Sequence, residues 1–235
     1  ALNITDKPSN NFDHKHSVFP LLCSGWLVFT NIPTQTKLPH CIDQIGVSVA
    51  DDLVAFFLEE HNRSVLGDLA ETLYVEDFVV ADIGAGTGYF TFPIARRVHR
   101  GKVFSVDIQS EMLALISRRK VLENVANVET VLGEADDPKL PDNEIDLAFI
   151  VDAYHEFSFP REMGERLTES LKPGGQLVLV EYRAEDPRVP IKRLHKMSEV
   201  QVRQEMAAIG LDWVRTESYL PQQHVLVFQK PRAQP

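Results

Sequence analysis

The stretch from Val79 to Tyr89 constrains the fold of this chain more than any other part of its sequence. It reads Val-Val-Ala-Asp-Ile-Gly-Ala-Gly-Thr-Gly-Tyr, an apolar run followed by three alternating glycines. Glycine lets a chain turn tightly and lets a ligand approach the backbone. The free N–H groups of a helix that follows such a turn attract a carboxylate or a phosphate. The stretch therefore predicts a strand, a ligand-binding turn and a helix.

The spacing of the glycines separates the candidate cofactors. Gly84, Gly86 and Gly88 form G-x-G-x-G, whereas the dinucleotide fingerprint is G-x-G-x-x-G. Asp82, two residues before the first glycine, suits a cofactor that carries an ammonium group. A nucleotide-dependent oxidoreductase on a similar fold is an alternative, but this sequence lacks the G-x-G-x-x-G turn expected of such an enzyme. A non-catalytic cofactor-binding module is a second alternative, because a fold does not establish a function.

From residue 78 onward, short apolar runs alternate with helical segments, which is typical of a parallel sheet covered on both faces. The expected strands are 78–83, 103–107, 128–132, 145–151, 177–182, 213–219 and 225–228. The expected helices are 89–99, one that begins near 110, 160–171 and one that ends at 210. Since no helix separates the last two strands, we expect them to form a hairpin with one antiparallel strand.

Several helix ends have recognisable signals. Ser110 is the expected cap of the second helix, and Pro160 suits the first position of the third. The segment 172–175, Lys-Pro-Gly-Gly, is expected to stop that third helix, and Ser198 with Gln201 resembles a capping box. The expected buried face of the second helix carries Met112, Leu113, Ile116 and Leu122.

The N-terminal third of the chain differs from the rest. Residues 1–45 are rich in Asn, Pro, Thr and Ser without a sustained period and are expected to form an irregular arm. Residues 46–76 have apolar side chains at helical spacing and predict a helical cap at the entrance of a domain that spans 77–235. The apolar stretch 18–29 is too short and too interrupted for a membrane span. We expect a cytoplasmic protein, with an exported form as the alternative that this stretch leaves open.

Composition narrows the class of partner. With 44% hydrophobic residues the chain can build a sizeable core, and its net charge of −10 opposes an extended nucleic-acid footprint. A small molecule is therefore the expected partner. Cys23 and Cys41 lack the spacing of a metal site, and no metal is expected.

A second segment extends the pattern of the glycine turn. Asp107 ends the run Phe-Ser-Val-Asp at the close of the second expected strand. Together the two segments resemble motif I and the following acidic position of the class I, Rossmann-like S-adenosylmethionine-dependent methyltransferases, particularly bacterial ones that act on small molecules. The resemblance covers about 78–230. It implies a seven-stranded, mostly parallel α/β sheet with helices on both faces and an antiparallel last strand, and methyl transfer that leaves S-adenosylhomocysteine (EC 2.1.1.-).

The resemblance also implies the residues that hold the cofactor. Asp107 would accept hydrogen bonds from both ribose hydroxyls, as a carboxylate can. The segment 133–137 is similar to the family's G-D-A segment beside the adenine, but Glu134 stands where the family has Asp, so the acid that faces the ring is left open, and these acids are also typical of a solvated loop. The implied cofactor-binding residues are Asp82, Gly84, Ala85, Gly86, Gly88, Asp107, Ile108, Glu134, Ala135, Asp136 and Asp152.

Catalytic candidates follow the fourth expected strand, where ligands bind in open α/β sheets. His155 is the candidate general base and Tyr154 the second candidate, since histidine titrates near neutral pH. Glu156 would orient His155 only if the two side chains met, and adjacent strand residues point to opposite faces. Further candidates to line the same pocket are Glu181, Tyr182, Arg183 and His195. A basic cluster, comprising Arg188, Lys192, Arg193, His195 and Lys196, is either a solvated loop or a lid that attracts an anion.

Overall fold

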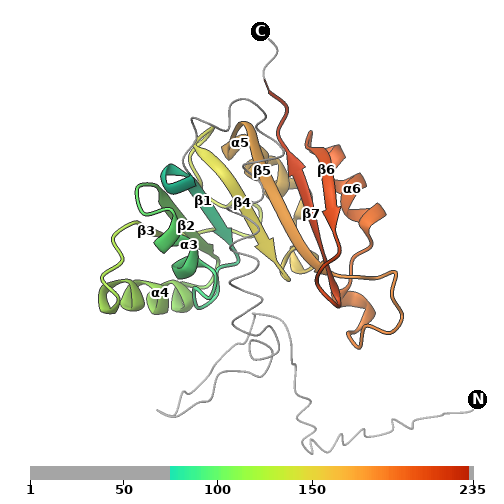
Figure 1. The fold of residues 1–235 in the computed structure, drawn as a ribbon, viewed down its shortest axis with the longest axis horizontal. Helices are drawn as coiled ribbons and strands as arrows, with labels where there is room; N and C mark the ends of the chain where they lie inside the picture. Colours follow the sequence, from blue (N-terminus) through green and yellow to red (C-terminus); the bar gives the residue numbers. More distant parts are fainter. Residues whose placement is uncertain (1–74, 233–235) are drawn as a thin grey trace, which may run out of the picture.

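The structure, a computed structural model, describes residues 75–232, which form one seven-stranded sheet flanked by helices (Figure 1). The strands are β1 (Val79–Ile83), β2 (Lys102–Asp107), β3 (Val128–Leu132), β4 (Ile145–Val151), β5 (Leu171–Tyr182), β6 (Asp212–Glu217) and β7 (Gln223–Gln229). Their order in the sheet is β3-β2-β1-β4-β5-β7-β6. Strand β7 runs antiparallel to both of its neighbours, and the remaining pairs are parallel. The predicted mostly parallel sheet with an antiparallel last strand is confirmed.

Helices cover both faces of the sheet, as the sequence predicts. They are α3 (Thr91–Arg97), α4 (Ser110–Leu122), α5 (Pro160–Ser170) and α6 (Glu199–Ala208), with the 3-10 turns η4 (Val75–Asp77), η5 (Tyr154–Glu156) and η6 (Arg193–His195). Helix α3 is shorter than the predicted 89–99, because residues 89 and 90 still belong to the glycine turn.

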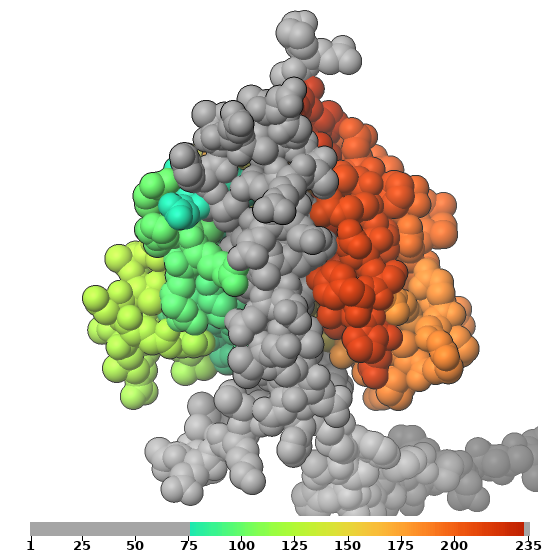
Figure 2. All heavy atoms as spheres, in the orientation of Figure 1, coloured from blue at the N-terminus to red at the C-terminus, as the bar shows by residue number. Residues whose placement is uncertain are grey.

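Two buried clusters divide the apolar side chains of the sheet between its faces. Val80 of β1 packs in one cluster with Phe92 of α3 and Ile116 of α4. Ala81, the next residue of β1, packs in the other with residues of α5 and α6. Both faces of the sheet are therefore buried, which explains why the strand sequences are continuous apolar runs rather than alternations of apolar and polar residues. Figure 2 shows that the first and second halves of the described chain lie on opposite flanks of the molecule.

Two expectations for α4 are wrong. Its N-cap is Gln109, and the hydroxyl of Ser110 donates to the neighbouring Glu111 carboxylate rather than accepting a hydrogen bond from a backbone N–H. The N–H of Gln109, the residue before the helix, donates to the side chain of Asp107. Leu122, the last residue of α4, is 75% exposed instead of buried.

The segment 172–175 also differs from its prediction. Helix α5 does end at Ser170, and Pro160 occupies its start as expected. Residues 172–175, however, already belong to β5. A Cβ added at Gly175 would lie 2.8 Å from the carbonyl oxygen of Ile145, so the glycine permits the close approach of β4 at the point where the pairing register shifts.

Of the capping box predicted at the start of α6, the bond to Ser198 is confirmed and the return bond from Gln201 is not. Ser198 is the N-cap, and its hydroxyl oxygen accepts a hydrogen bond from the N–H of Gln201 at 3.2 Å. The side chain of Gln201 donates to Glu205 rather than returning to the cap. Helix α6 ends at Ala208, just before the positive φ of Gly210.

The arm predicted for 1–45 and most of the helical cap predicted for 46–76 lie outside the described residues. Within 75–232, no helix combines the length and the apolar character that crossing a membrane requires.

Candidate functional site

The predicted site residues gather at one edge of the sheet, where its parallel strands end. Strand order reverses between β1 and β4, since β2 and β3 follow on one side and β5 on the other. Ligands of open α/β sheets bind beyond the carboxyl ends of the strands at such a reversal. The glycine turn follows β1, Asp107 ends β2, and Asp152 to Glu156 follow β4.

The three glycines of the turn have the same backbone handedness but different surroundings. Gly84, Gly86 and Gly88 have φ values of +73°, +53° and +79°. A Cβ at Gly88 would lie 2.9 Å from the ring of Phe92, and one at Gly84 would lie 3.3 Å from the Cβ of Ala153. Among residues 75–232, and apart from its two chain neighbours, no atom would lie within 4 Å of a Cβ at Gly86. Gly86 is thus the position where a ligand can approach the backbone.

Asp107 joins this turn to the neighbouring strand. One carboxylate oxygen accepts the N–H of Gly86 at 2.9 Å, and the other accepts the N–H of Gln109 at 2.8 Å. Burial raises the pKa of Asp107, and these two hydrogen bonds oppose that rise. Each oxygen still has a lone pair for a further donor. The side chain of Ile108, beside it, is 39% exposed and offers an apolar surface at the same edge.

Asp82 lies beneath the turn rather than on its surface. It is 3% exposed, and its carboxylate accepts a hydrogen bond of 2.6 Å from the hydroxyl of Thr91. The same hydroxyl lies 3.1 Å from that of Ser105. Burial raises the pKa of Asp82 to about 7. In this position Asp82 joins β1 to the start of α3 and thereby supports the shape of the turn.

The acids after β3 lie on the surface. Glu134 and Asp136 are exposed, as is Ala135 between them. The ammonium group of Lys139 forms ion pairs with Glu134 at 3.2 Å and with Asp137 at 2.9 Å. The N–H of Gly133 donates to the carbonyl oxygen of Asp107, so this loop begins beside the end of β2.

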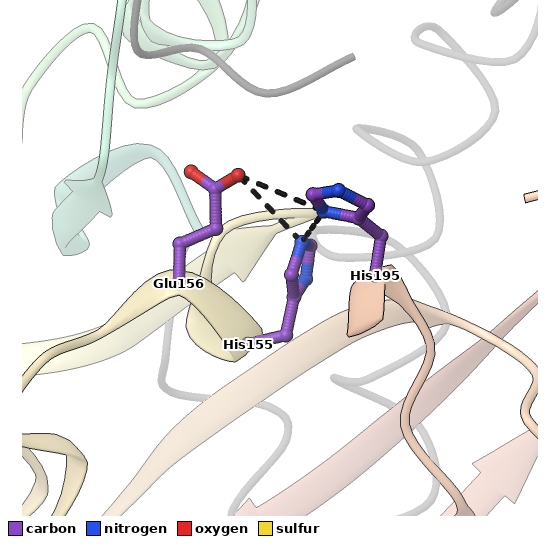
Figure 3. Close-up of side chains that lie close together, drawn as sticks. All are labelled: His155, Glu156 and His195. Atoms are coloured by element: carbon purple, nitrogen blue, oxygen red, sulfur yellow. Dashed lines mark hydrogen bonds and ion pairs between the residues drawn. The ribbon is translucent and has the colours of Figure 1, made fainter. Parts of the chain in front are cut away.

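A second group of side chains converges after β4 and β5. Glu181 is fully buried; one oxygen accepts the N–H of Tyr154 at 2.9 Å and the other lies 2.7 Å from Nδ1 of His155. Nε2 of His155 lies 3.2 Å from Nδ1 of His195 (Figure 3). Oε1 of Glu156 lies 3.8 Å from the first of these nitrogens and 3.9 Å from the second. Residues 154–156 form a 3-10 turn, not a strand, which explains why adjacent side chains meet.

We call His155, His195, Glu156 and Glu181 the histidine cluster. Together with the neighbouring Asp152 it is rich in negative charge. Burial lowers the pKa of His155, but the hydrogen bond and charge of Glu181 outweigh it, and the net shift is upward. Burial raises the pKa of Asp152 to about 7, and the charge of Glu181 adds to that rise. Asp152 also has a φ of +53°, rare for a residue with a side chain. Its Oδ1 is buried without a hydrogen-bond partner among the described residues.

The side chains of Tyr154 and Arg183, two other sequence candidates, make their hydrogen bonds and contacts away from His155. Tyr154 is 4% exposed in the core beside α6, and burial together with the carboxylate of Glu205 raises its pKa. The guanidinium of Arg183 donates to backbone carbonyls of Ser218 and Leu220. Within the basic cluster, Arg188 pairs with Asp186 and Lys196 donates to backbone carbonyls, so His195 is the member that reaches the site.

The role of Glu181 is not evident from the sequence. The sequence presents it, with Tyr182 and Arg183, as a candidate to line the pocket, whereas in the structure Glu181 is the residue of these three that forms a hydrogen bond with His155. Strand register explains this contact. Because β4 and β5 pair Val151 with Val180, the next residues, Asp152 and Glu181, lie at the same edge of the sheet.

Comparison with known sequences adds a family to this geometry. Residues 80–175 match the family described as a methyltransferase domain. An uncharacterized methyltransferase-like protein of Schizosaccharomyces pombe is 32% identical over 128 residues, which are 54% of this chain and 47% of that protein. The ubiquinone/menaquinone biosynthesis C-methyltransferase UbiE of Hydrogenovibrio crunogenus is 33% identical over 106 residues, 44% of this chain and 42% of that protein. The matches thus span less than half the length of these two curated relatives.

Comparison with solved structures supports the architecture. A SAM-dependent methyltransferase from Aquifex aeolicus superposes with a TM-score of 0.61 at 23% sequence identity. The match covers 76% of this chain and 97% of that one. The fold is therefore shared with that methyltransferase.

Proposed function

We propose that this chain transfers a methyl group from S-adenosylmethionine to a small-molecule acceptor, and the match of residues 80–175 to the methyltransferase-domain family supports this. The carrying observation is the pairing of Gly86 with Asp107: an open backbone position hydrogen-bonded to a carboxylate one strand away. A nucleoside with an amino-acid tail needs both features. The tail approaches a glycine turn at a helix start, and the sugar offers two hydroxyl donors.

The residues present fit this cofactor. Asp107 would receive the ribose hydroxyls on the lone pairs that Gly86 and Gln109 leave free. Ile108 would cover one face of the adenine, with Glu134, Ala135 and Asp136 near its edge. Gly84, Ala85, Gly86 and Gly88 would surround the amino-acid tail, with Asp82 acting through the turn and Asp152 nearest the tail.

Chemistry follows from alignment at the sheet edge. When bound, the cofactor would supply an electrophilic sulfonium methyl group, with S-adenosylhomocysteine as the leaving group. Holding the acceptor, the methyl carbon and the sulfur in line can lower the activation barrier by an amount on the order of 7–11 kcal/mol in favourable intramolecular models. If the acceptor must lose a proton, His155 would take it at Nε2 while Glu181 holds Nδ1. Tyr154, buried against α6, is the weaker candidate.

The acceptor class is suggested by one relative. The name of UbiE specifies C-methylation in ubiquinone and menaquinone biosynthesis. We propose a hydroxyl-bearing small molecule, such as a quinol, as the acceptor here. The acidic net charge of −10 supports this over a nucleic acid, and a cytoplasmic location is part of the same proposal.

The test is calorimetric titration of the full chain with S-adenosylhomocysteine, NAD and ATP separately. We expect micromolar binding of the first alone, weakened at least tenfold by Asp107→Ala because a charged hydrogen-bond acceptor is removed. Asp142→Ala, which removes an exposed carboxylate elsewhere, is the matched control and keeps full affinity. A preference for NAD contradicts the proposal and favours an oxidoreductase.

Turnover separates an enzyme from a binding module. Wild-type protein is screened with radiolabelled S-adenosylmethionine against a panel of quinols and other phenolic small molecules. Cofactor binding without turnover of any acceptor favours a non-catalytic module. Where turnover is found, an unchanged rate in His155→Ala eliminates His155 as the base.

A further inference from the structure

The histidine cluster contains three potential ligand atoms that face a common point. They are Nε2 of His155, Nδ1 of His195 and Oε1 of Glu156, and they lie 3.2, 3.8 and 3.9 Å from one another (Figure 3). From this convergence we infer that these three atoms bind one divalent transition-metal ion. Two imidazoles and a carboxylate suit zinc, iron and related ions, and three protein ligands are the usual number where a metal site keeps an open position.

The spacing of the three atoms matches a single ion. Zinc bonds to histidine nitrogen and carboxylate oxygen are about 2.0–2.2 Å long, so tetrahedral ligands lie roughly 3.3–3.6 Å apart. The observed distances of 3.2–3.9 Å bracket that range. Binding therefore requires side-chain movements of only a few tenths of an ångström, without a change of backbone.

Glu181 prepares His155 for this role. Its oxygen accepts the proton on Nδ1 of His155 at 2.7 Å, which leaves the lone pair of Nε2 directed toward His195 and Glu156. A carboxylate that binds the second nitrogen of a metal-ligating histidine fixes the tautomer and makes the ligand more basic. Glu181 is a positioning residue here, since it does not itself face the ion.

Charge gives an independent reason for a cation. Asp152, Glu156 and Glu181 bring three carboxylates together, and within 75–232 no lysine or arginine forms an ion pair with any of them. Oε2 of Glu156 and Oδ1 of Asp152 are buried without a hydrogen-bond partner in the described part of the chain. Buried carboxylates are costly unless they are paired or bind a metal. A divalent ion offsets this excess.

The site adjoins the proposed cofactor turn, because Ala153 faces Gly84. An ion with three protein ligands keeps positions for water or for an acceptor oxygen, whose pKa a metal lowers. The ion would use the Nε2 lone pair that a base needs, so a metal-bound His155 cannot also act as the base. The inference replaces the sequence-based expectation that no metal is bound.

The experiment compares variants of the full chain after removal of metals with EDTA. Co²⁺ is titrated and followed by its visible absorption, and Zn²⁺ is titrated by calorimetry. We expect wild-type protein to bind one ion that His195→Ala fails to bind, and Glu156→Gln to bind it at least tenfold more weakly. His99→Ala, which removes an exposed histidine outside the cluster, is the matched control and keeps the site. Because His195 is partly exposed in the short 3-10 turn η6, we expect its substitution to leave the fold intact.

Equal Co²⁺ spectra and equal Zn²⁺ affinity in wild type and His195→Ala would overturn the inference. Thermal unfolding is a second readout, since an ion that binds only the folded chain raises Tm, and this rise must disappear in His195→Ala. Titration with S-adenosylhomocysteine on the same samples keeps the two proposals apart. Metal binding without cofactor binding rejects the methyltransferase proposal alone, and cofactor binding without metal binding rejects the ion site alone.

Discussion

The glycine turn after β1 and the histidine cluster after β4 lie at the same edge of one sheet but are built differently. The turn is made of backbone groups, and its main link, from Gly86 to Asp107, joins positions 21 residues apart. The cluster is made of side chains, and His155 meets Glu181 across 26 residues and His195 across 40. A backbone site can be read from a local pattern, whereas a side-chain site depends on which strands become neighbours.

The two regions also differ in how their acids are satisfied. Both oxygens of Asp107 accept backbone N–H groups, and the carboxylate of Asp82 accepts a hydroxyl. In the cluster, Asp152 and Glu156 each keep a buried oxygen without a partner among residues 75–232. The turn is thus a preorganised binding surface, while the cluster holds excess negative charge that a proton or a cation can neutralise.

Stability against pH gives the largest expected effect, and it concerns the acid beneath the turn. Burial raises the folded-state pKa of Asp82 from 3.8 to about 7. As pH rises between these values the unfolded chain loses this proton first, so the contribution of Asp82 to stability falls. Asp82→Asn removes that loss, and its stability relative to wild type should rise from pH 4 to pH 8, by at most about 4 kcal/mol. Urea unfolding at both pH values measures it. If the difference in unfolding free energy between Asp82→Asn and wild type does not change with pH, the pKa of Asp82 is not raised in the folded protein.

A pair of glycine substitutions tests whether the turn divides into packing and ligand positions. Gly88→Ala should destabilise by about 3 kcal/mol, since the new methyl meets Phe92 and Ile116 at a positive φ. Gly86→Ala should cost only about 1 kcal/mol, from backbone strain, yet weaken S-adenosylhomocysteine binding at least tenfold. Thermal unfolding and calorimetry of both variants provide the two readouts. Equal losses of stability would remove the distinction between the two glycines.

The smallest expected effect tests the independence of the two regions. Glu181→Gln keeps the shape of the side chain but weakens its hydrogen bonds to Tyr154 and His155, at a cost of about 1.5 kcal/mol in unfolding free energy. Because Glu181 does not contact the glycine turn in the hydrogen bonds of the described residues, affinity for S-adenosylhomocysteine should stay within about twofold. A loss of cofactor affinity as large as that of Asp107→Ala would show that the two regions act as one site.

Much of the fold follows from local sequence signals. All seven expected strands are present, although β5 begins at Leu171 rather than at 177, and the lack of an intervening helix correctly predicts the hairpin at the end. Three expectations are wrong. Ser110 is the first residue of α4 rather than its cap, Leu122 is exposed, and the close approach of β4 places 172–175 in the sheet.

The sequence by itself determined the turn, because alternating glycines after an apolar strand restrict the backbone wherever that strand is placed. It also named His155 and His195 as separate candidates. Only the tertiary structure decided that Glu181, His155, His195 and Glu156 form one cluster, because their contacts require β4 and β5 to pair in register and the loop before α6 to return over them. Distances between side chains that are far apart in the chain have no local signature, and the chemistry of this edge depends on them.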